Sequence, residues 1–433
     1  MSSMKQAGAS RQAVPDRGRG VVVGIDVSKG WVDYGCCFSD ERGPVRRVSQ
    51  DVGGYRQLEA QLQELQQRQC EVWVGLEPTG AYSTCVQEWL VERGWRVVQV
   101  NPYHVRRIKE VRDNSPGKSD RKDAGVIADL VWQGCYQHPL RLQGVYAQLR
   151  AAGAEWASLG RRRTSVANEF QALLQVWFPE LVGLYRDRLC LTVRALVRRY
   201  EGVAALVRAG KRSLRRTLKR ACRGRGGDRV ERIWQAARAS VAPRAGQEAR
   251  HRALLGLVEL LETIERRQEA LAAEMAQLLT QVPQAACWLS LPGVGVVTTA
   301  GLLGECGPLG DYGSRRQIEK LVGLNLYSLS SGQYQGRCRV SKRGRGRARY
   351  LLCSLAMRQT RSGGLWHEWA VAAKAHGKRP AQIRVAVARK LLALIYAMMR
   401  DGTVYQAERR IAGDGAADGP FIHQGAPVPV AAA

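Results

Sequence analysis

The sequence predicts a mixed α/β domain followed by a mostly helical remainder. Two apolar runs, at 20–27 and 71–76, are typical of buried strands, and leucines at helical spacing lie between them. From about residue 141 to 281, helical spacing replaces the strand-like runs. With 433 residues, of which 45% are hydrophobic, the chain is long enough for two or three domains with cores of their own.

The order of elements in the first domain indicates its fold. We expect residues 1–18 to be a disordered basic tail. Strands are expected at 20–27, 31–38, 45–50, 71–76 and 95–100, and helices at 54–69, 82–93 and 120–133, the last capped by Ser119. Three early strands followed by alternating helix and strand is the order of the ribonuclease-H-like fold. A dinucleotide-binding fold fits less well, because no Gly-x-Gly-x-x-Gly follows the first strand. We therefore predict a ribonuclease-H-like domain over 19–140.

Four carboxylates occupy positions that this fold would bring together. Asp26 lies in the first apolar run, and Glu77 follows the run at 71–76. Asp120 and Asp123 are three residues apart at the start of a helix, which puts them on one face. Converging carboxylates repel each other unless cations lie between them, and two divalent ions can clamp the attacking and leaving oxygens of a phosphodiester. Each acid alone is more often a capping or surface residue, but together they predict a site for two Mg²⁺ or Mn²⁺ ions.

The charge of the chain indicates a polyanionic partner. Lys and Arg number 67 against 38 Asp and Glu, a formal net charge of +29. The planar fork of arginine binds two phosphate oxygens at once, so nucleic acid is favoured. An anionic membrane surface could also attract this charge, but no apolar stretch approaches the roughly 18 residues of a spanning helix, and residues 1–20 lack the apolar core of a signal peptide.

The eleven cysteines are scattered, odd in number, and form no Cys-x-x-Cys. We expect a reducing cytoplasm and mostly buried thiols, rather than a disulfide framework or a zinc site.

The region 141–284 is predicted to be a helical spacer. Its apolar stripe could form a coiled coil with another helix or pack within its own domain, and the sequence favours neither. The stripe comprises Leu254, Leu257, Leu260, Leu261, Ile264, Leu271 and Met275. The segment 208–232 contains eleven basic residues against two acids, too one-sided for a salt-bridged helix, so phosphate contact is predicted. The residues assigned to this contact are Arg212, Arg215, Arg216, Lys219 and Arg220.

The region 285–401 is predicted to be a second, mainly helical domain, followed by a low-complexity tail at 402–433. It opens with Leu-Pro-Gly-Val-Gly at 291–295, which resembles a helix–hairpin–helix turn that offers backbone N–H groups to phosphate; a plain helix-linking turn is an equal alternative. A basic run at 337–349 is assigned to nucleic-acid binding through Arg337, Arg339, Lys342, Arg343, Arg345 and Arg347.

A Ser-Ser-Gly sequence, Ser330-Ser331-Gly332, lies just before this basic run. By itself it is most often a turn. A serine hydroxyl is a weak nucleophile unless a base, a lowered pKa or a metal activates it. Held near metal-bound carboxylates it could attack phosphorus, and the neighbouring guanidinium groups would stabilise the developing charge.

Three motifs of the first domain carry a resemblance to a known family. They are Gly-Ile-Asp-Val-Ser-Lys at 24–29, Glu-Pro-Thr-Gly at 77–80 and Lys-Ser-Asp-x-x-Asp-Ala at 118–124. They resemble the RuvC-like domain of the DEDD transposases of bacterial insertion sequences, a family that includes the pilin gene invertase. The Leu-Pro-Gly-Val-Gly, Ser-Ser-Gly and Ser-Lys-Arg-Gly (341–344) motifs resemble that family's second conserved domain.

The resemblance implies a DNA recombinase that excises and inserts its element. It implies guidance by a structured RNA encoded beside the gene, and action as a homodimer or homotetramer near the bacterial nucleoid. It also implies a composite site in which Asp26, Glu77, Asp120 and Asp123 bind metal and Ser331 becomes covalently joined to DNA. Ser330 remains an alternative nucleophile, and Leu326 stands where many relatives carry a proline.

Two other functions remain open at this point: a RuvC-like junction-resolving nuclease that activates water, and a non-catalytic RNA- or DNA-binding protein. Among further residues, Asp33 could be a fifth carboxylate but is more often expected to face solvent. Tyr103 and His104 could contact nucleic acid, although a turn after the fifth strand is at least as frequent.

Overall fold

The computed structural model describes residues 13–16, 18–39, 41–68, 70–113, 120–222, 227–328, 330–331, 334–336 and 338–406. Within these ranges, the side chains of 109–113, 120–122, 227–228, 330–331 and 334–335 are not described. Most of the two expected tails and the expected cap Ser119 lie outside the described residues. The chain divides into one unit that ends at Arg141 and another that begins at Leu142. Each is treated by itself.

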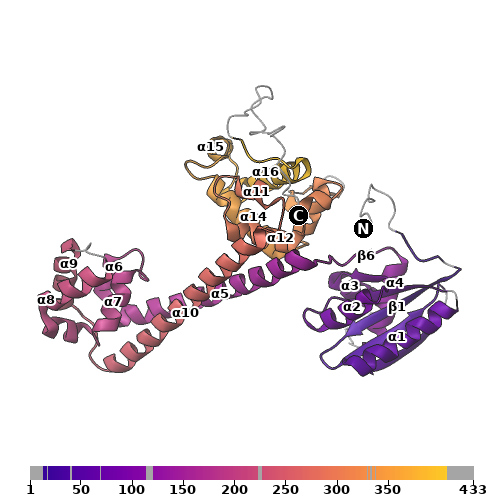
Figure 1. Cartoon of the computed structure of the whole chain (residues 1–433), viewed down its shortest axis with the longest axis horizontal. Coiled ribbons are helices and arrows are strands. Elements are labelled where there is room, and N and C mark those ends of the chain that lie inside the picture. Colours follow the sequence, from indigo (N-terminus) through magenta and orange to yellow (C-terminus); the bar gives the residue numbers. More distant parts are fainter. Residues whose placement is uncertain are drawn as a thin grey trace. The chain divides into compact units, whose positions relative to one another are not determined.

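The N-terminal unit is built on a mixed sheet (Figure 1). Its strands are β1 (Gly20–Val27), β2 (Trp31–Cys37), β3 (Arg42–Ser49), β4 (Glu71–Leu76), β5 (Val97–Val100) and β6 (Tyr136–Gln137), in the order β3-β2-β1-β4-β5-β6. The first three are antiparallel neighbours, β1, β4 and β5 run parallel, and β6 is antiparallel to β5. The five expected strands are confirmed, whereas β6 was not predicted.

Helices cover both faces of this sheet. They are α1 (Val52–Gln67), α2 (Tyr82–Glu92), α3 (Pro102–Asp113) and α4 (Asp120–Trp132). Strand residues alternate between the two faces. On one face, Val23 packs in a core with Leu58 of α1, and on the other Val22 packs with Ile127 of α4. The turn expected at Tyr103 and His104 is wrong, because both residues belong to the first turn of α3.

The C-terminal unit is helical and centres on two long antiparallel helices, α5 (Gly144–Trp177) and α10 (Gln247–Leu279) (Figure 1). The start of α5 and the end of α10 share a core with the last helices of the chain. The other halves of both helices share a second core with α6 (Pro179–Leu184), α7 (Leu191–Arg199), α8 (Val203–Ala221) and α9 (Gly227–Arg238). The apolar stripe of α10 therefore packs within its own unit, except at Leu260, which is 46% exposed. We call α6–α9 the head.

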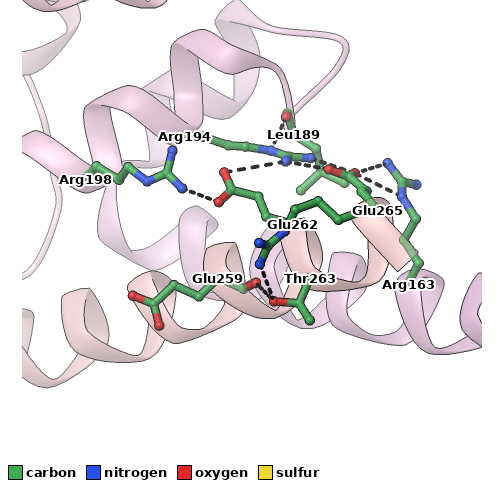
Figure 2. A network of polar contacts seen from close by, with 9 residues as sticks. Arg163, Leu189, Arg194, Arg198, Glu259, Glu262, Thr263 and Glu265 are labelled. Carbon is green, nitrogen blue, oxygen red and sulfur yellow. Dashed lines mark hydrogen bonds and ion pairs between the residues drawn. The ribbon is translucent and has the colours of Figure 1, made fainter. Parts of the chain in front are cut away.

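An ion-pair network fixes the head to the long helices (Figure 2). Arg194 of α7 is 8% exposed and donates to both carboxylate oxygens of Glu265 on α10, at 2.7 and 2.9 Å. Arg163 of α5 donates to the same carboxylate at 2.8 Å, and Arg198 pairs with Glu262. The hydrogen bonds from Arg194 are the main cause of a lowered pKa for Glu265. Because Arg194 is nearly buried, leaving its charge unpaired would be costly, so these contacts hold α7 against α5 and α10.

The remaining helices form the last domain: α11 (Ala285–Leu289), α12 (Val296–Cys306), α13 (Arg315–Val322), α14 (Gly346–Gln359), α15 (His367–Ala375) and α16 (Pro380–Asp401), with a short 3₁₀ turn, η1 (Leu309–Asp311), after α12. Between α13 and α14 lie four two-residue strands that were not expected from the sequence. They are β7 (Leu326–Tyr327), β8 (Ser330–Ser331), β9 (Tyr334–Gln335) and β10 (Arg339–Val340). Strand β7 pairs with β10 and β8 with β9, so the segment doubles back on itself as an interrupted hairpin.

The mixed α/β sheet and the mostly helical remainder are thus as predicted. None of the helices in the described ranges is both long enough and apolar enough to cross a membrane.

Candidate active site

A row of three glycines lets α4 lie directly on the sheet. Gly24 of β1 is in register with Gly35 of β2 on one side and Gly75 of β4 on the other. A Cβ built on Gly24 would be 1.9 Å from the backbone oxygen of Ala124 in α4. One on Gly75 would be 2.7 Å from a methyl of Val131. Helix α4 therefore approaches β1 more closely than any side chain at Gly24 would allow.

Helix α4 runs antiparallel to β1. A Cβ on Gly20, at the start of β1, would lie 3.0 Å from the ring of Trp132, the last residue of α4. Gly24 contacts Ala124, near the beginning of α4. The first turn of α4 therefore lies toward the edge of the sheet where β1 ends.

Two of the expected carboxylates stand at that same edge. Asp26 is two residues beyond Gly24, and Glu77 is two beyond Gly75, so each shares the face that α4 covers. Because β1 and β4 are parallel and Ile25 is in register with Leu76, Asp26 and Glu77 are the next neighbours across the two strands. Neighbouring strands are about 4.8 Å apart. Both acids are half-buried.

The other two expected carboxylates are on α4. Asp123 is half-buried and immediately precedes Ala124, the residue that contacts Gly24. Asp120 begins α4, one turn earlier, and its side chain is not described. No group of three or more His, Cys, Asp or Glu among the described side chains is arranged as a metal site. The donor set itself, four carboxylates, is the oxygen chemistry that Mg²⁺ and Mn²⁺ bind.

The loop that carries Glu77 is tied to the end of β1. The Thr79 hydroxyl donates to the backbone oxygen of Val27 at 3.1 Å, and the Thr79 N–H donates to the Ser83 hydroxyl at 3.2 Å. Gly80 provides the positive φ of 65° with which the loop turns into α2. These contacts hold Glu77 beside Asp26. This role of Thr79 was not predicted from the sequence.

Asp33 extends the row of acids. It lies opposite Asp26 in the β1–β2 register and is 3% exposed, so the expectation that it faces solvent is wrong. Both of its carboxylate oxygens accept hydrogen bonds from Arg47, each at 2.8 Å, and Arg47 is its partner across β2 and β3. Along this edge of the sheet the chain thus places Arg47, Asp33, Asp26 and Glu77 side by side.

The expected nucleophile lies in the hairpin of the other unit. Ser331 pairs with Tyr334 in the last backbone pair of β8 and β9, with two residues between them, and Ser330 pairs with Gln335. Both serines therefore lie next to the turn of the hairpin.

Two of the expected phosphate-binding arginines have partners inside the protein. Glu305 of α12 is 7% exposed and pairs with Arg345 at 3.5 Å and also with Arg347. Arg347 donates in addition to the backbone oxygen of Arg150 in α5, at 3.1 Å. These arginines tie the start of α14 to α12 and α5, and their contact with nucleic acid remains a prediction. Arg339, Lys342 and Arg343 are exposed, and Arg337 lies outside the described residues.

The basic residues of α8 lie on an exposed face. After a kink at Gly210, whose φ is 82°, Leu214 and Leu218 are buried in the core of the head. The residues on the opposite face are exposed: Lys211, Arg212, Arg215, Arg216, Lys219 and Arg220. Lys211 pairs with Glu231 of α9, while the other five take part in none of the ion pairs formed between described residues. This face carries an unbalanced positive charge, as the sequence predicted for the segment.

The Leu-Pro-Gly-Val-Gly segment is a turn between α11 and α12. Gly293 has a φ of 73°, and buried Gln359 of α14 donates to the backbone oxygen of Pro292. Gly295 is the N-cap of α12. The turn joins two helices as expected, and phosphate binding there remains a prediction.

The eleven cysteines are free thiols. Burial raises the pKa of Cys37 to about 11 and that of Cys306 to about 12. Both are therefore protonated near neutral pH and poor nucleophiles.

Comparison with known proteins decides the family. Residues 23–179 match a model of the DEDD-type transposase domain of IS110 elements, and residues 285–370 match a model described as transposase of the IS116/IS110/IS902 family. The chain belongs to the IS110 family of insertion-sequence transposases. All four acids of this IS110-type transposase lie in the first match and Ser331 lies in the second. Membership of a transposase family makes it a DNA-binding protein of a class of DNA-cleaving and transposing enzymes.

Two relatives extend the comparison. The IS110-type transposase is 27% identical over 310 residues to the 43.6 kDa protein of insertion element IS110 from Streptomyces coelicolor, over 69% of this chain and 75% of that protein. It is 25% identical over 295 residues to the 42 kDa protein of insertion element IS900 from Mycobacterium paratuberculosis, over 67% and 73% of the two chains.

Proposed function

We propose that this transposase exchanges DNA strands by metal-dependent transesterification through a covalent serine–DNA intermediate, guided by a structured RNA encoded beside its gene. The observation that carries the proposal is the edge of the N-terminal sheet. Asp26 and Glu77 are neighbours there, and the glycine row brings the first turn of α4, with Asp120 and Asp123, onto the same face.

The N-terminal unit is, in this proposal, a ribonuclease-H-like domain. Its strand order supports the assignment: β3, β2 and β1 form an antiparallel meander, and β4 and β5 continue the sheet parallel to β1. Catalytic acids on the first strand, just after the fourth strand and at the start of a helix packed on the same face are what such a domain would present to a phosphodiester.

Asp26, Glu77, Asp120 and Asp123 would hold two Mg²⁺ or Mn²⁺ ions. Bound there, the ions supply positive charge to the attacking and leaving oxygens of the phosphodiester. The protein contributes the positions of the ligands. Thr79 keeps Glu77 beside β1, and the contact of α4 with Gly24 sets the height of Asp123 above the sheet.

Ser331 is the proposed nucleophile, and Ser330 the alternative. The serine Oγ would lose its proton and form a bond to phosphorus, while the bond from phosphorus to one DNA strand breaks and that strand leaves as a hydroxyl after taking up a proton. Because the phosphoserine keeps the energy of the broken phosphodiester, the hydroxyl of another strand can later attack it and release the serine. The position of Ser331 in the last backbone pair of β8 and β9, next to the point where the chain reverses, supports this role.

Partition of labelled DNA during phenol extraction tests the nucleophile. Cleaved DNA is expected to enter the protein phase with the wild type and with Ser330→Ala, and to be absent from it with Ser331→Ala. Asp26→Asn should abolish cleavage altogether. If Ser331→Ala still cleaves and the products remain in the aqueous phase, the enzyme activates water as a junction-resolving nuclease does. If only Ser330→Ala loses the adduct, Ser330 is the nucleophile.

The basic face of α8 would hold the RNA or the DNA through phosphates. The six exposed basic residues on this face lie near only one acid, Glu231, among the described residues, and this supports the proposal because an excess of positive charge on an exposed helix face is available to a polyanion. The exposed residues of the run at 337–349 would add contacts beside the hairpin. Whether the enzyme acts as a homodimer or homotetramer is part of the same proposal and is tested by its mass in solution with the RNA bound.

Salt dependence tests the α8 contact. Arg215→Gln combined with Arg216→Gln is expected to reduce the slope of log affinity against log salt concentration by about 2, roughly one per lost phosphate contact. Arg252→Gln is the matched control, because Arg252 is exposed on the same unit but paired with Glu248. Equal slopes for both variants would remove α8 from the binding surface.

A further inference from the structure

We propose that the ion pair between the buried carboxylate of Asp33 and Arg47 is a positioning element, which confines metal binding to the Glu77 side of Asp26. This inference rests on the proposed function and concerns a pair to which that function gives no role. Asp33 is a carboxylate at the same edge of the sheet as the proposed metal ligands, and its oxygens accept hydrogen bonds from a guanidinium group.

The sheet register places the pair. Asp26 and Asp33 are directly opposite each other in the antiparallel β1–β2 ladder, and Asp33 and Arg47 are opposite each other in the β2–β3 ladder. Residues opposite each other in such a ladder share a face and have Cβ atoms about 4.5–5.5 Å apart. Asp33 is thus as close a neighbour of Asp26 on one side as Glu77 is on the other.

The geometry of the pair shows how Asp33 is occupied. Arg47 donates through Nε to one oxygen and through Nη2 to the other, both at 2.8 Å, the two-pronged arrangement in which arginine binds carboxylate most strongly. The Asp33 side chain is 4% exposed while that of Arg47 is 50% exposed. The Asp33 carboxylate is therefore buried, and the partly exposed Arg47 side chain lies between it and the solvent.

The chemical consequence concerns the number and place of the ions. Two carboxylates opposite each other, such as Asp26 and Asp33, could share a divalent cation through their oxygens. Because Arg47 donates to both oxygens of Asp33, Asp33 does not share a metal ion with Asp26. Asp26 therefore binds metal together with Glu77 and the acids of α4. The pair is also neutral as a whole, so it adds no net charge beside Asp26.

Charge balance makes the proposal testable with three variants. Asp33→Asn leaves the positive charge of Arg47 beside Asp26, and Arg47→Gln leaves the negative charge of Asp33. The double variant Asp33→Asn with Arg47→Gln removes both charges and restores neutrality. A unit charge roughly 8 Å from a divalent ion, in a partly solvated site, changes the ion's affinity by about tenfold.

The measurement is Mn²⁺ binding to the full chain without nucleic acid, followed by the electron paramagnetic resonance signal of free Mn²⁺. Binding that disappears in Asp26→Asn defines the site. We expect Asp33→Asn to weaken this binding about tenfold, and Arg47→Gln to strengthen it about tenfold and to add an ion. The double variant should return to within about threefold of the wild type.

A purely structural role gives a different pattern. The single variants would then lower the melting temperature measured without metal, and the double variant would not regain the wild-type melting temperature. The Asp26-dependent affinity for Mn²⁺ would be unchanged in all three variants. This result would overturn the inference. If Arg47→Gln does not fold, Arg47→Lys is the second test. It keeps the positive charge and is therefore expected to bind the wild-type number of ions. An added ion in Arg47→Lys would contradict charge as the cause. If the wild type shows no Asp26-dependent binding, the proposed metal site itself fails, and the inference with it.

Discussion

Replacing Gly24 with alanine tests how the proposed active site is assembled. The new Cβ would lie 1.9 Å from the Ala124 oxygen, 2.9 Å from the Ala124 carbonyl carbon and 3.0 Å from the Ala128 nitrogen. All three are backbone atoms of α4, so no side chain can rotate away to relieve the overlap. To bring the shortest contact to 3.0 Å, α4 must move away from β1 by at least about 1.1 Å.

This displacement has two measurable consequences. Forcing an extra methyl group into a packed contact costs roughly 1–3 kcal/mol of unfolding free energy. Asp123 is next to Ala124, so it moves with the helix, and a misplacement of about 1 Å at a reacting centre lowers the rate by about 100-fold, or about 2.7 kcal/mol of activation free energy. We therefore expect Gly24→Ala to lose more activity than its stability alone explains.

Gly35→Ala is the matched control. Gly35 is in register with Gly24 on the same sheet, but its Cβ would lie 3.3 Å from a methyl of Val45 and 3.8 Å from the Cβ of Ala124. These are side-chain atoms that need to move only slightly. Urea unfolding followed by circular dichroism gives the stability, and Mg²⁺-dependent DNA cleavage at a saturating concentration of metal gives the rate. Equal stability and equal rate for Gly24→Ala and Gly35→Ala would refute the assembly described here.

Three further outcomes are expected. Thr79→Val removes the hydroxyl that ties the loop of Glu77 to β1 and should raise the Mg²⁺ concentration for half-maximal cleavage, whereas Thr79→Ser should not; equal values would show that the loop needs no such tie. The pKa of Glu265 is lowered by its arginine partners, so its contribution to stability is complete above its unfolded pKa of about 4.3 and is lost as pH falls through the folded value. The melting temperature of the wild type should therefore fall more steeply with decreasing pH than that of Glu265→Gln from about pH 5 downward, and parallel curves of melting temperature against pH would contradict this. Cys85 is exposed and should react with a disulfide reagent at pH 8 before unfolding, while Cys37, with its pKa raised by burial, should react only after it; early labelling of Cys37, located by peptide mass, would contradict its burial.

The strands of the N-terminal sheet could be predicted because apolar runs have to be buried on both faces. The short strands β6 to β10 could not, since two residues do not form a pattern. Helix α3 was missed although a signal was present: Pro102 is its first residue, and the Asn101 side chain accepts from the Tyr103 N–H at 2.9 Å as a cap does.

The candidate site was predicted in part. The four acids could be predicted to lie near one another from their order along the chain, because their positions depend on strands and a helix that the sequence indicates. The role of Gly24 and Gly75, each two residues before an acid, could not be predicted, because it depends on the register of β1 with β4. The burial of Asp33 and the pairing of Arg347 with Glu305 depend on residues distant in the sequence, Arg47 and a neighbouring helix. Patterns within one segment do not contain that information.

The most direct test of the central claim is the mass of the peptide that carries the nucleophile. Trypsin cleaves after Lys320 and Arg337, which leaves one peptide, 321–337, with Ser330 and Ser331 inside it. After reaction with DNA and digestion of the bound strand, this peptide is expected to gain a nucleotide phosphate on Ser331, in the presence of Mg²⁺ but not in Asp26→Asn. DNA cleaved by the wild type with the peptide 321–337 left unmodified would contradict the serine intermediate.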